Sequence, residues 1–229
     1  MSKAEATTLM GLEEAIRTRR SVRGYLDKPV PKEVLEQVFA LAQWTPSNCN
    51  IQPWKVYVAS GETRDRLRTR IVESVMKGEA FKPDYDYPGK FEGEYRTRQV
   101  ACAVEMYTKM GIGREDSAGR ARASLRNFEL FDAPHVAFIG MDKAFGTTVA
   151  LDVGMYGQSL MLAMTAYGIS SCAQGSMRYH PDFVREEFGV GEEIRILFGI
   201  SFGYVDPSVP ANETRIDRLD FRESVVFKD

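Results

Sequence analysis

Helical and strand patterns alternate along the whole chain of 229 residues, and no repeat or low-complexity linker divides it. Apolar periodicity and helix-start signals predict helices at residues 12–20, 31–45, 62–78, 94–110, 114–130, 147–167 and 181–188. Runs of β-branched and aromatic residues predict strands at residues 54–59, 135–141 and 194–202, with residues 221–227 as a candidate final strand. This order of elements favours one α+β domain built around a sheet.

Composition excludes several classes of protein. The net charge of −2 gives no support for nucleic-acid binding, and no apolar run reaches the roughly 20 residues that a membrane helix needs. Cys49, Cys102 and Cys172 form neither a pairing framework nor a CxxC motif, so no metal site is expected. The first ten residues lack the apolar core of a secretory signal. We therefore expect a cytoplasmic protein with no metal, membrane or nucleic-acid partner.

The segment RRSVRGY, residues 19–25, ends the first predicted helix. The apolar face of Leu12, Ala15 and Ile16 continues into Arg19, which is unusual because arginine is rarely buried without a partner. Three arginines and one serine stand close together: Arg19, Arg20, Ser21 and Arg23. Guanidinium groups offer planar forks of donors and a permanent charge, so the cluster suits a phosphate. A solvated basic turn is the alternative.

A polar loop, TPSNCNIQPW at residues 45–54, lies between a predicted helix and a predicted strand. Its side chains Ser47, Asn48, Asn50 and Gln52 offer both donors and acceptors, which suits an uncharged polar ring edge or a polyol. The same residue types also form ordinary helix-terminating turns, so both readings stay open.

The predicted helix at 147–167 contains Gly154 and Gly157, which allow another backbone to approach closely. It serves either core packing or a close helix–helix dimer contact. A short loop with Gln174 and Gly175 follows it, and the tail carries Arg215, Arg218 and Arg222. A charge group near a terminus is usually a solvated face.

Together these segments resemble the nitroreductase-like family of FMN-dependent oxidoreductases. RRSVRGY looks like the family's first flavin-binding motif and TPSNCNIQPW like its second. The helix LDVGMYGQSLMLAMTAYGISS is similar to the family's dimer-interface helix, CAQGS to its flavin-ring loop, and FGYVDPSVPANETRIDRLDF to its phosphate-contacting tail. The resemblance covers residues 12–227, and the motifs follow in the family's order.

The resemblance implies a nitroreductase-like α+β sandwich over residues 1–229. Its central, mainly antiparallel sheet is flanked by helices, residues 81–130 form a lid or helical excursion, and the C-terminal extension is swapped in a homodimer. It also implies an FMN site that consists of Arg19, Arg20, Ser21, Arg23, Pro46, Ser47, Asn48, Asn50, Ala173, Gln174, Gly175, Arg215 and Arg218. Many relatives have an acidic residue where Gln174 stands. The second loop reaches the flavin in some cases from the partner subunit.

The implied activity is an FMN-dependent NAD(P)H oxidoreductase. NADH or NADPH gives hydride to flavin N5, and a nitroaromatic or quinone-type acceptor then enters the same pocket, which predicts ping-pong kinetics. The flavin carries the chemistry, so no catalytic side chain is expected. His135 is expected to be structural and His180 to be a capping or surface residue. Two alternatives are a reductive dehalogenase of the iodotyrosine deiodinase kind and a non-enzymatic flavin-binding module; residues 81–98 lack the deiodinase-like Glu-x-x-x-Tyr.

Substrate selection is expected in the segment 81–94, whose aromatic residues suit a lid that stacks on a flat substrate. An ordinary loop with aromatics packed onto the body is the alternative. The expected pocket residues are Phe81, Tyr85, Tyr87, Phe91, Asn127 and Phe128. Arg96 and Arg98 are candidates for an anionic group on the substrate or on NADPH.

Overall fold

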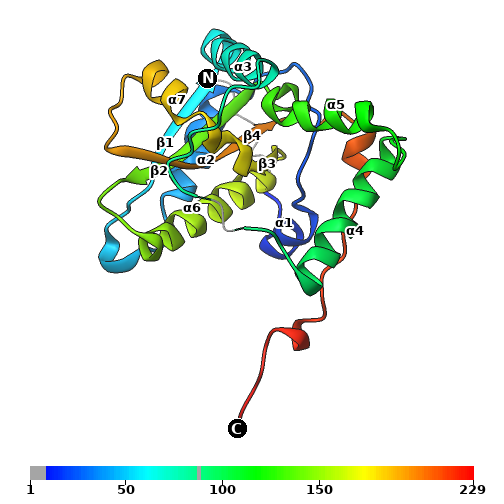
Figure 1. Cartoon of the computed structure of the whole chain (residues 1–229). Helices are drawn as coiled ribbons and strands as arrows, with labels where there is room; N and C mark the ends of the chain where they lie inside the picture. The colour runs from blue at the N-terminus through cyan, green and yellow to red at the C-terminus, as the bar shows by residue number, and fades with distance from the viewer. Residues whose placement is uncertain (1–8, 87–88) are drawn as a thin grey trace, which may run out of the picture.

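A computed structural model describes residues 9–86 and 89–229 of the chain (Figure 1). Its α-helices are α1 (Leu12–Thr18), α2 (Lys32–Ala42), α3 (Gly61–Met76), α4 (Gly93–Lys109), α5 (Ser117–Phe128), α6 (Thr147–Ala166) and α7 (Pro181–Phe188). Its strands are β1 (Lys55–Ser60), β2 (His135–Asp142), β3 (Ser170–Gln174) and β4 (Ile194–Gly203). The seven helices match the predicted ones, with ends that differ by up to three residues.

The four strands form one sheet in the order β1-β2-β4-β3, and every neighbouring pair is antiparallel. The predicted antiparallel α+β architecture is therefore confirmed. Strand β3 was not predicted, because its sequence SSCAQ contains small and polar residues in place of the usual β-branched ones. It nevertheless pairs with β4 along its whole length, from Ser170 opposite Gly203 to Gln174 opposite Gly199.

Helices cover both faces of the sheet. Alternate residues of β2 point to opposite sides, so Ala137 and Ile139 face one layer while Val136 and Phe138 face the other. Helices α2 and α6 pack on the first face, and α3 and α7 pack on the second. All four side chains are fully buried, which places the core on both sides of β2.

Helices α4 and α5 lie together on one side of the molecule (Figure 1). Helix α4 contacts the turn at Pro210–Glu213, whereas α5 contacts α3. Both helices lie within residues 81–130, the range for which a lid or helical excursion is expected.

Two expected features differ in the structure. The face of α1 is not a buried stripe, because Leu12 is 70% and Ile16 is 52% exposed while Ala15 alone is buried. Residues 221–227 form no strand in this chain; they include a short 3-10 turn at Phe221–Glu223 within a tail that extends away from the body (Figure 1). An extended tail has no sheet edge to join within its own chain.

His135 is buried, as expected for a structural residue, and both of its ring nitrogens are used. Nε2 accepts from the backbone N–H of Val30 at 2.9 Å, and Nδ1 lies 2.5 Å from Ser60 Oγ. Burial and then the charge of Arg64 lower the pKa of His135 to about 4. His180 is the N-cap residue of α7, as expected for a capping residue, although its side chain makes no capping hydrogen bond. It is buried rather than on the surface, and its ring stacks on Phe183 with the centroids 5.1 Å apart.

We expect the low pKa of His135 to make the fold acid-sensitive. His135 binds a proton near pH 6.5 in the unfolded chain but only near pH 4 in the folded chain. Its neutral ring therefore contributes fully to the free energy of unfolding above pH 6.5, and this contribution declines as the pH falls toward 4. Between pH 7 and pH 5 the loss is up to about 2 kcal/mol. Urea denaturation at several pH values measures it, with His135→Gln as the variant in which this slope is reduced. An equally steep slope in the variant would contradict the assignment.

Candidate functional site

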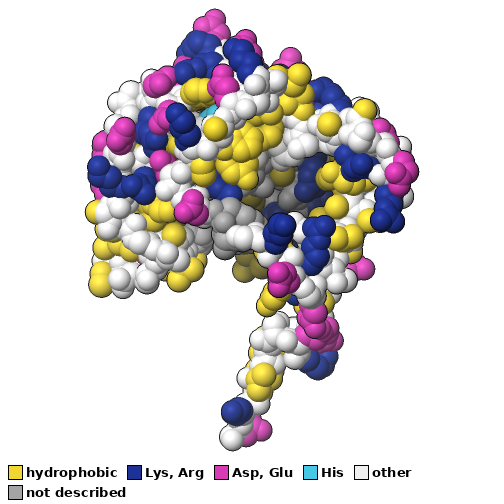
Figure 2. Space-filling view, viewed as in Figure 1, with side chains coloured by type: hydrophobic (Ala, Val, Ile, Leu, Met, Phe, Trp, Pro, Cys, Tyr) yellow, Lys and Arg dark blue, Asp and Glu magenta, His cyan; other side chains and the backbone are white. Residues whose placement is uncertain are grey.

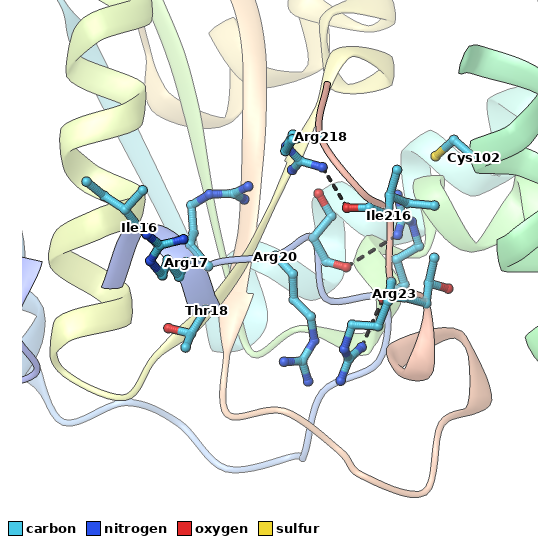
Figure 3. A pocket seen from close by; sticks show the side chains of 12 residues that line it. Ile16, Arg17, Thr18, Arg20, Arg23, Cys102, Ile216 and Arg218 are labelled. Atoms are coloured by element: carbon cyan, nitrogen blue, oxygen red, sulfur yellow. Dashed lines mark hydrogen bonds between the residues drawn. The ribbon is translucent and has the colours of Figure 1, made fainter. Parts of the chain in front are cut away.

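A cavity of about 770 Å³ lies between the segment that follows α1 and the start of the C-terminal tail. Figure 3 shows the side chains that surround it, with those of Arg20 and Arg23 extending in the same direction. Its lining is Ile16, Arg17, Thr18, Arg19, Arg20, Ser21, Arg23, Cys102, Thr214, Arg215, Ile216 and Arg218. The structure thus brings together the two arginine groups, which are almost 200 residues apart in the sequence.

The backbone of the first arginine segment is fixed against β3. Ser21 forms a parallel bridge with Ser171, and the N–H of Val22 donates to Ser171 O at 3.1 Å. This isolated bridge joins the segment to β3, which is an edge strand of the sheet. The arginine side chains therefore project from a backbone that the core holds in place.

Asn212 connects the first arginine segment to the chain that leads into the C-terminal tail. Its Oδ1 accepts from the N–H of Arg23 at 2.7 Å, and its Nδ2 donates to Gly24 O at 2.9 Å and to Asp206 O at 2.8 Å. A Cβ at Gly24 would lie 2.5 Å from Val209, so only glycine allows this close approach. Asn212 is buried and was not predicted; only these long-range contacts reveal its role.

Arg20 carries an unfavourable charge in this arrangement. Burial and then the positive charge of Arg215 lower its pKa from the ordinary value. Its Nε is buried and has no hydrogen-bond partner among the described residues. An anion in the cavity would remove both penalties, because it would accept a hydrogen bond and offset the repulsion between the two arginines.

The cavity holds positive charge without a matching negative one. Its lining contains six arginines and no carboxylate or histidine. Arg17 is paired with Glu13 at 2.9 Å, whereas Arg215 and Arg218 donate only to backbone carbonyls of the tail within the described part of the chain. In the view of Figure 2, the surface is hollowed beside α4 and α5, and Lys and Arg side chains lie at its edge. These features suit a phosphate.

The second loop lies outside the lining of this cavity. Its conformation is strained, since Cys49, Asn50 and Gln52 all have positive φ. The buried carboxylate of Asp152 on α6 accepts from the N–H of Asn48 at 3.0 Å and holds the loop to that helix. The predicted cofactor residues Pro46, Ser47, Asn48 and Asn50 are therefore not brought to the arginines of the same chain.

The predicted ring-contacting residues lie where β3 ends. Ala173 and Gly175 are exposed, but the side chain of Gln174 is buried and turned into the protein. Gln174 Nε2 donates to Asn127 O at 2.7 Å, and its Oε1 accepts from the hydroxyl of Ser201. The side chain of Gln174 is thus not available to a ligand in this conformation.

Comparison with known proteins gives these features a context. The sequence profile described as the Nitroreductase family matches residues 16–204. The chain belongs to the nitroreductase family. It is 38% identical to the nitroreductase NfnB of Mycolicibacterium smegmatis over 94% of this chain and 92% of that protein. It is 33% identical to a chloronitrobenzene nitroreductase of Comamonas testosteroni, over 94% and 96% of the two chains.

Solved structures of the family have the same fold. The FMN-dependent nitroreductase NfnB of Mycobacterium smegmatis, solved with NADPH, superposes with a TM-score of 0.90 and covers 95% of this chain and 97% of that one. An FMN and NADPH-dependent nitroreductase NfnB of Sphigopyxis sp. strain HMH, 31% identical, gives 0.92 over 96% of this chain and 100% of that one. The similarity in sequence and structure therefore covers nearly the whole chain.

The residues predicted for the substrate pocket of this nitroreductase-family chain occupy different places. Phe81 stacks on Tyr179 with the centroids 4.5 Å apart, and Tyr85 packs against the core with Arg195 over its ring. Phe128 is buried among core residues. Tyr87 lies outside the described residues. These contacts place Phe81 and Tyr85 on the body of the protein.

A second cavity of about 330 Å³ adjoins the first and shares Arg23 and Cys102 with it. It lies between α4, α5 and the turn at 209–211, and its other lining residues are Gln99, Ala103, Met106, Met110, Ala123, Arg126, Asn127, Phe131, Val209, Pro210 and Ala211. Asn127 is the predicted pocket residue found here. The mixture of apolar side chains with a few polar groups is typical of small-molecule sites.

The described residues contain no grouping of three His, Cys, Asp or Glu side chains that would hold a metal ion. Within the same residues no helix is long and apolar enough to span a membrane.

Proposed function

We propose that the chain is an FMN-dependent NAD(P)H oxidoreductase that reduces nitroaromatic or quinone-type acceptors. The observation that carries this proposal is the arginine cavity, whose unpaired Arg20 and excess positive charge fit the phosphate of FMN. Its relatives support it, since they are named as nitroreductases over nearly the full length of the chain.

In this proposal the chain binds and orients its reactants. When bound, FMN supplies hydride acceptance at N5 and electron transfer to the acceptor. Arg19, Arg20 and Arg23 bind the phosphate, with Arg215 and Arg218 as further contacts from the tail. Ser21 has a hydroxyl at the same cavity and suits the ribityl chain. The exposed Ala173 and Gly175 leave the end of β3 open for the flat ring.

Reduction of bound flavin by a pyridine nucleotide tests the proposed function. The purified protein is loaded with FMN and mixed anaerobically with NADH or NADPH in a stopped-flow instrument. We expect the visible flavin absorbance to bleach with at least one donor and to return when a nitroaromatic is added. If neither donor reduced the flavin, a flavin-binding module would be favoured. If the reduced protein ignored nitroaromatics but released halide from a halotyrosine, the deiodinase-like alternative would be favoured.

The active form in this proposal is a homodimer with swapped C-terminal extensions. A single chain exposes large apolar side chains on α1, on α2 and the turn after it, on α6 and on the tail, among them Leu12, Ile16, Leu41, Trp44, Leu151, Met155, Val226 and Phe227. Such a surface is typical of a protein–protein contact. A partner copy would cover these side chains and bring its second loop, residues 46–50, to the arginine cavity.

We expect removal of residues 221–229 to weaken the dimer, because the deletion removes exposed apolar side chains that include Phe221, Val226 and Phe227. Light scattering at several protein concentrations would show a lower mean mass, and the truncated chain would retain less FMN on gel filtration. Lys228→Ala is the matched control and is expected to stay dimeric. A wild-type protein that is monomeric while holding FMN would contradict the proposed assembly.

A cytoplasmic location belongs to the same proposal. The cytoplasm supplies NAD(P)H, and the cysteines Cys49, Cys102 and Cys172 are free thiols, as is usual for proteins in a reducing compartment.

A further inference from the structure

A third hollow, of about 430 Å³, lies where the segment after residue 88 meets the first turns of α4. It is lined by Gly89, Lys90, Phe91, Arg96 and Gln99. The lining contains two cations and no carboxylate, so it carries positive charge as the arginine cavity does. A hollow of this charge favours an anion.

Neither cation is neutralised by the described residues. Arg96 Nη1 donates to Gln99 Oε1 at 2.6 Å, which orients the guanidinium without cancelling its charge. No ion pair of Lys90 or Arg96 is found in residues 9–86 and 89–229. Arg98, two residues further along the helix, differs because it pairs with Glu94 at 3.3 Å and lies over the ring of Tyr95. Of the two arginines expected to bind an anion, the structure therefore selects Arg96 and adds Lys90.

The hollow connects to the proposed active site. It shares Gln99 with the 330 Å³ cavity, which in turn shares Cys102 and Arg23 with the arginine cavity. Arg96, Gln99 and Cys102 are spaced by three residues on α4, and six residues of helix rise about 9 Å. A molecule in the middle cavity that carries an anionic group at one end would place this group beside Lys90 and Arg96.

We propose that Lys90 and Arg96 bind an oxyanion carried by one of the two reactants, either the 2′-phosphate of NADPH or the carboxylate of an aromatic acid acceptor. The chemistry is shared, since both groups accept charge-assisted hydrogen bonds from an ammonium and a guanidinium. The inference rests on the proposed function. It adds a selectivity site, which favours a reactant that carries this oxyanion over the analogue that lacks it.

Two pairs of reactants distinguish the sources. The holoenzyme is compared with the Lys90→Gln, Arg96→Gln double variant in two assays. The first varies the donor, NADPH or NADH, with neutral nitrobenzene as the acceptor. The second varies the acceptor, 4-nitrobenzoate or nitrobenzene, at a fixed NADH concentration. We expect the KM of one charged reactant to rise roughly fivefold or more, while the KM of its neutral or unphosphorylated counterpart stays unchanged. A rise for NADPH assigns the 2′-phosphate, and a rise for 4-nitrobenzoate assigns the carboxylate.

Equilibrium binding gives a readout independent of turnover. If the oxyanion is the 2′-phosphate of NADPH, the FMN-loaded variant loses affinity for 2′,5′-ADP but not for 5′-AMP. If it is the carboxylate of the acceptor, the variant loses affinity for 4-nitrobenzoate but not for nitrobenzene. Arg98→Gln is the matched control, since Arg98 is already paired with Glu94, and its KM values should equal those of the wild type.

Unchanged KM and affinity for every charged reactant in the double variant would overturn the inference. If this variant still reduced nitrobenzene with NADH, the proposed function would stand without it. A wild-type holoenzyme that reduced no acceptor would instead overturn the proposed function and this inference together.

Discussion

Replacement of Arg20 by alanine is expected to weaken FMN binding by roughly 30- to 150-fold, which corresponds to about 2–3 kcal/mol for a charge-assisted hydrogen bond. The reason is that Arg20 is partly buried beside Arg215 and has an unpaired Nε at the cavity. Titration of the apoprotein with FMN, followed by flavin fluorescence, measures the change.

Thermal melting without flavin separates a binding role from a structural one. Since Arg20 is repelled by Arg215 in the free protein, Arg20→Ala should melt no lower than the wild type when no FMN is present. Arg17→Ala is the matched control: Arg17 lines the same cavity, but it is exposed and paired with Glu13, so FMN affinity should change little. An Arg20→Ala protein with wild-type FMN affinity would contradict the phosphate assignment.

Replacement of Asp84 by alanine is expected to lower the free energy of unfolding by about 3 kcal/mol, the lower end of the range for a broken buried ion pair. The Asp84 carboxylate accepts from Arg185 Nη1 at 2.8 Å and from the N–H of Ile196 at 2.8 Å, and both charged side chains are almost fully buried. Alanine would leave the Arg185 guanidinium and the Ile196 N–H without this partner. Urea denaturation measures the loss.

Asp182→Ala provides the control on the same arginine. Asp182 also pairs with Arg185, but its side chain is 54% exposed, so its removal should cost less than about 1 kcal/mol. Equal destabilisation by the two variants would contradict the account of Asp84.

The parts of the fold with strong local patterns could be predicted from the sequence. Strand β2 is a run of apolar residues and α6 is a long apolar helix, so local preference and burial agree in both. Strand β3 has no such pattern, because SSCAQ owes its conformation to pairing with β4. The exposed Leu12 and Ile16 show that apolar periodicity can also mislead. It predicts that a side chain makes a contact, but it does not tell whether this contact lies within one chain or between two.

The candidate site was predictable where residue type alone indicates chemistry. Clustered arginines indicate an anion, and the structure brings those of the first segment and of the tail to one cavity. Asn212 and Asp84 could not be found in this way, because a single Asn or Asp in a loop has many ordinary roles. Their importance comes from partners 188 or 189 and 101 to 112 residues away, which only the folded chain brings together.

The most direct test of the arginine cavity as a phosphate site compares FMN with riboflavin, which has the same ring and ribityl chain but no phosphate. Calorimetric titration of the wild-type apoprotein should give a Kd for FMN at least roughly 100-fold lower than that for riboflavin, since several charge-assisted hydrogen bonds depend on the phosphate. This difference should shrink in Arg20→Ala. Equal affinities of the wild-type protein for FMN and riboflavin would contradict the assignment.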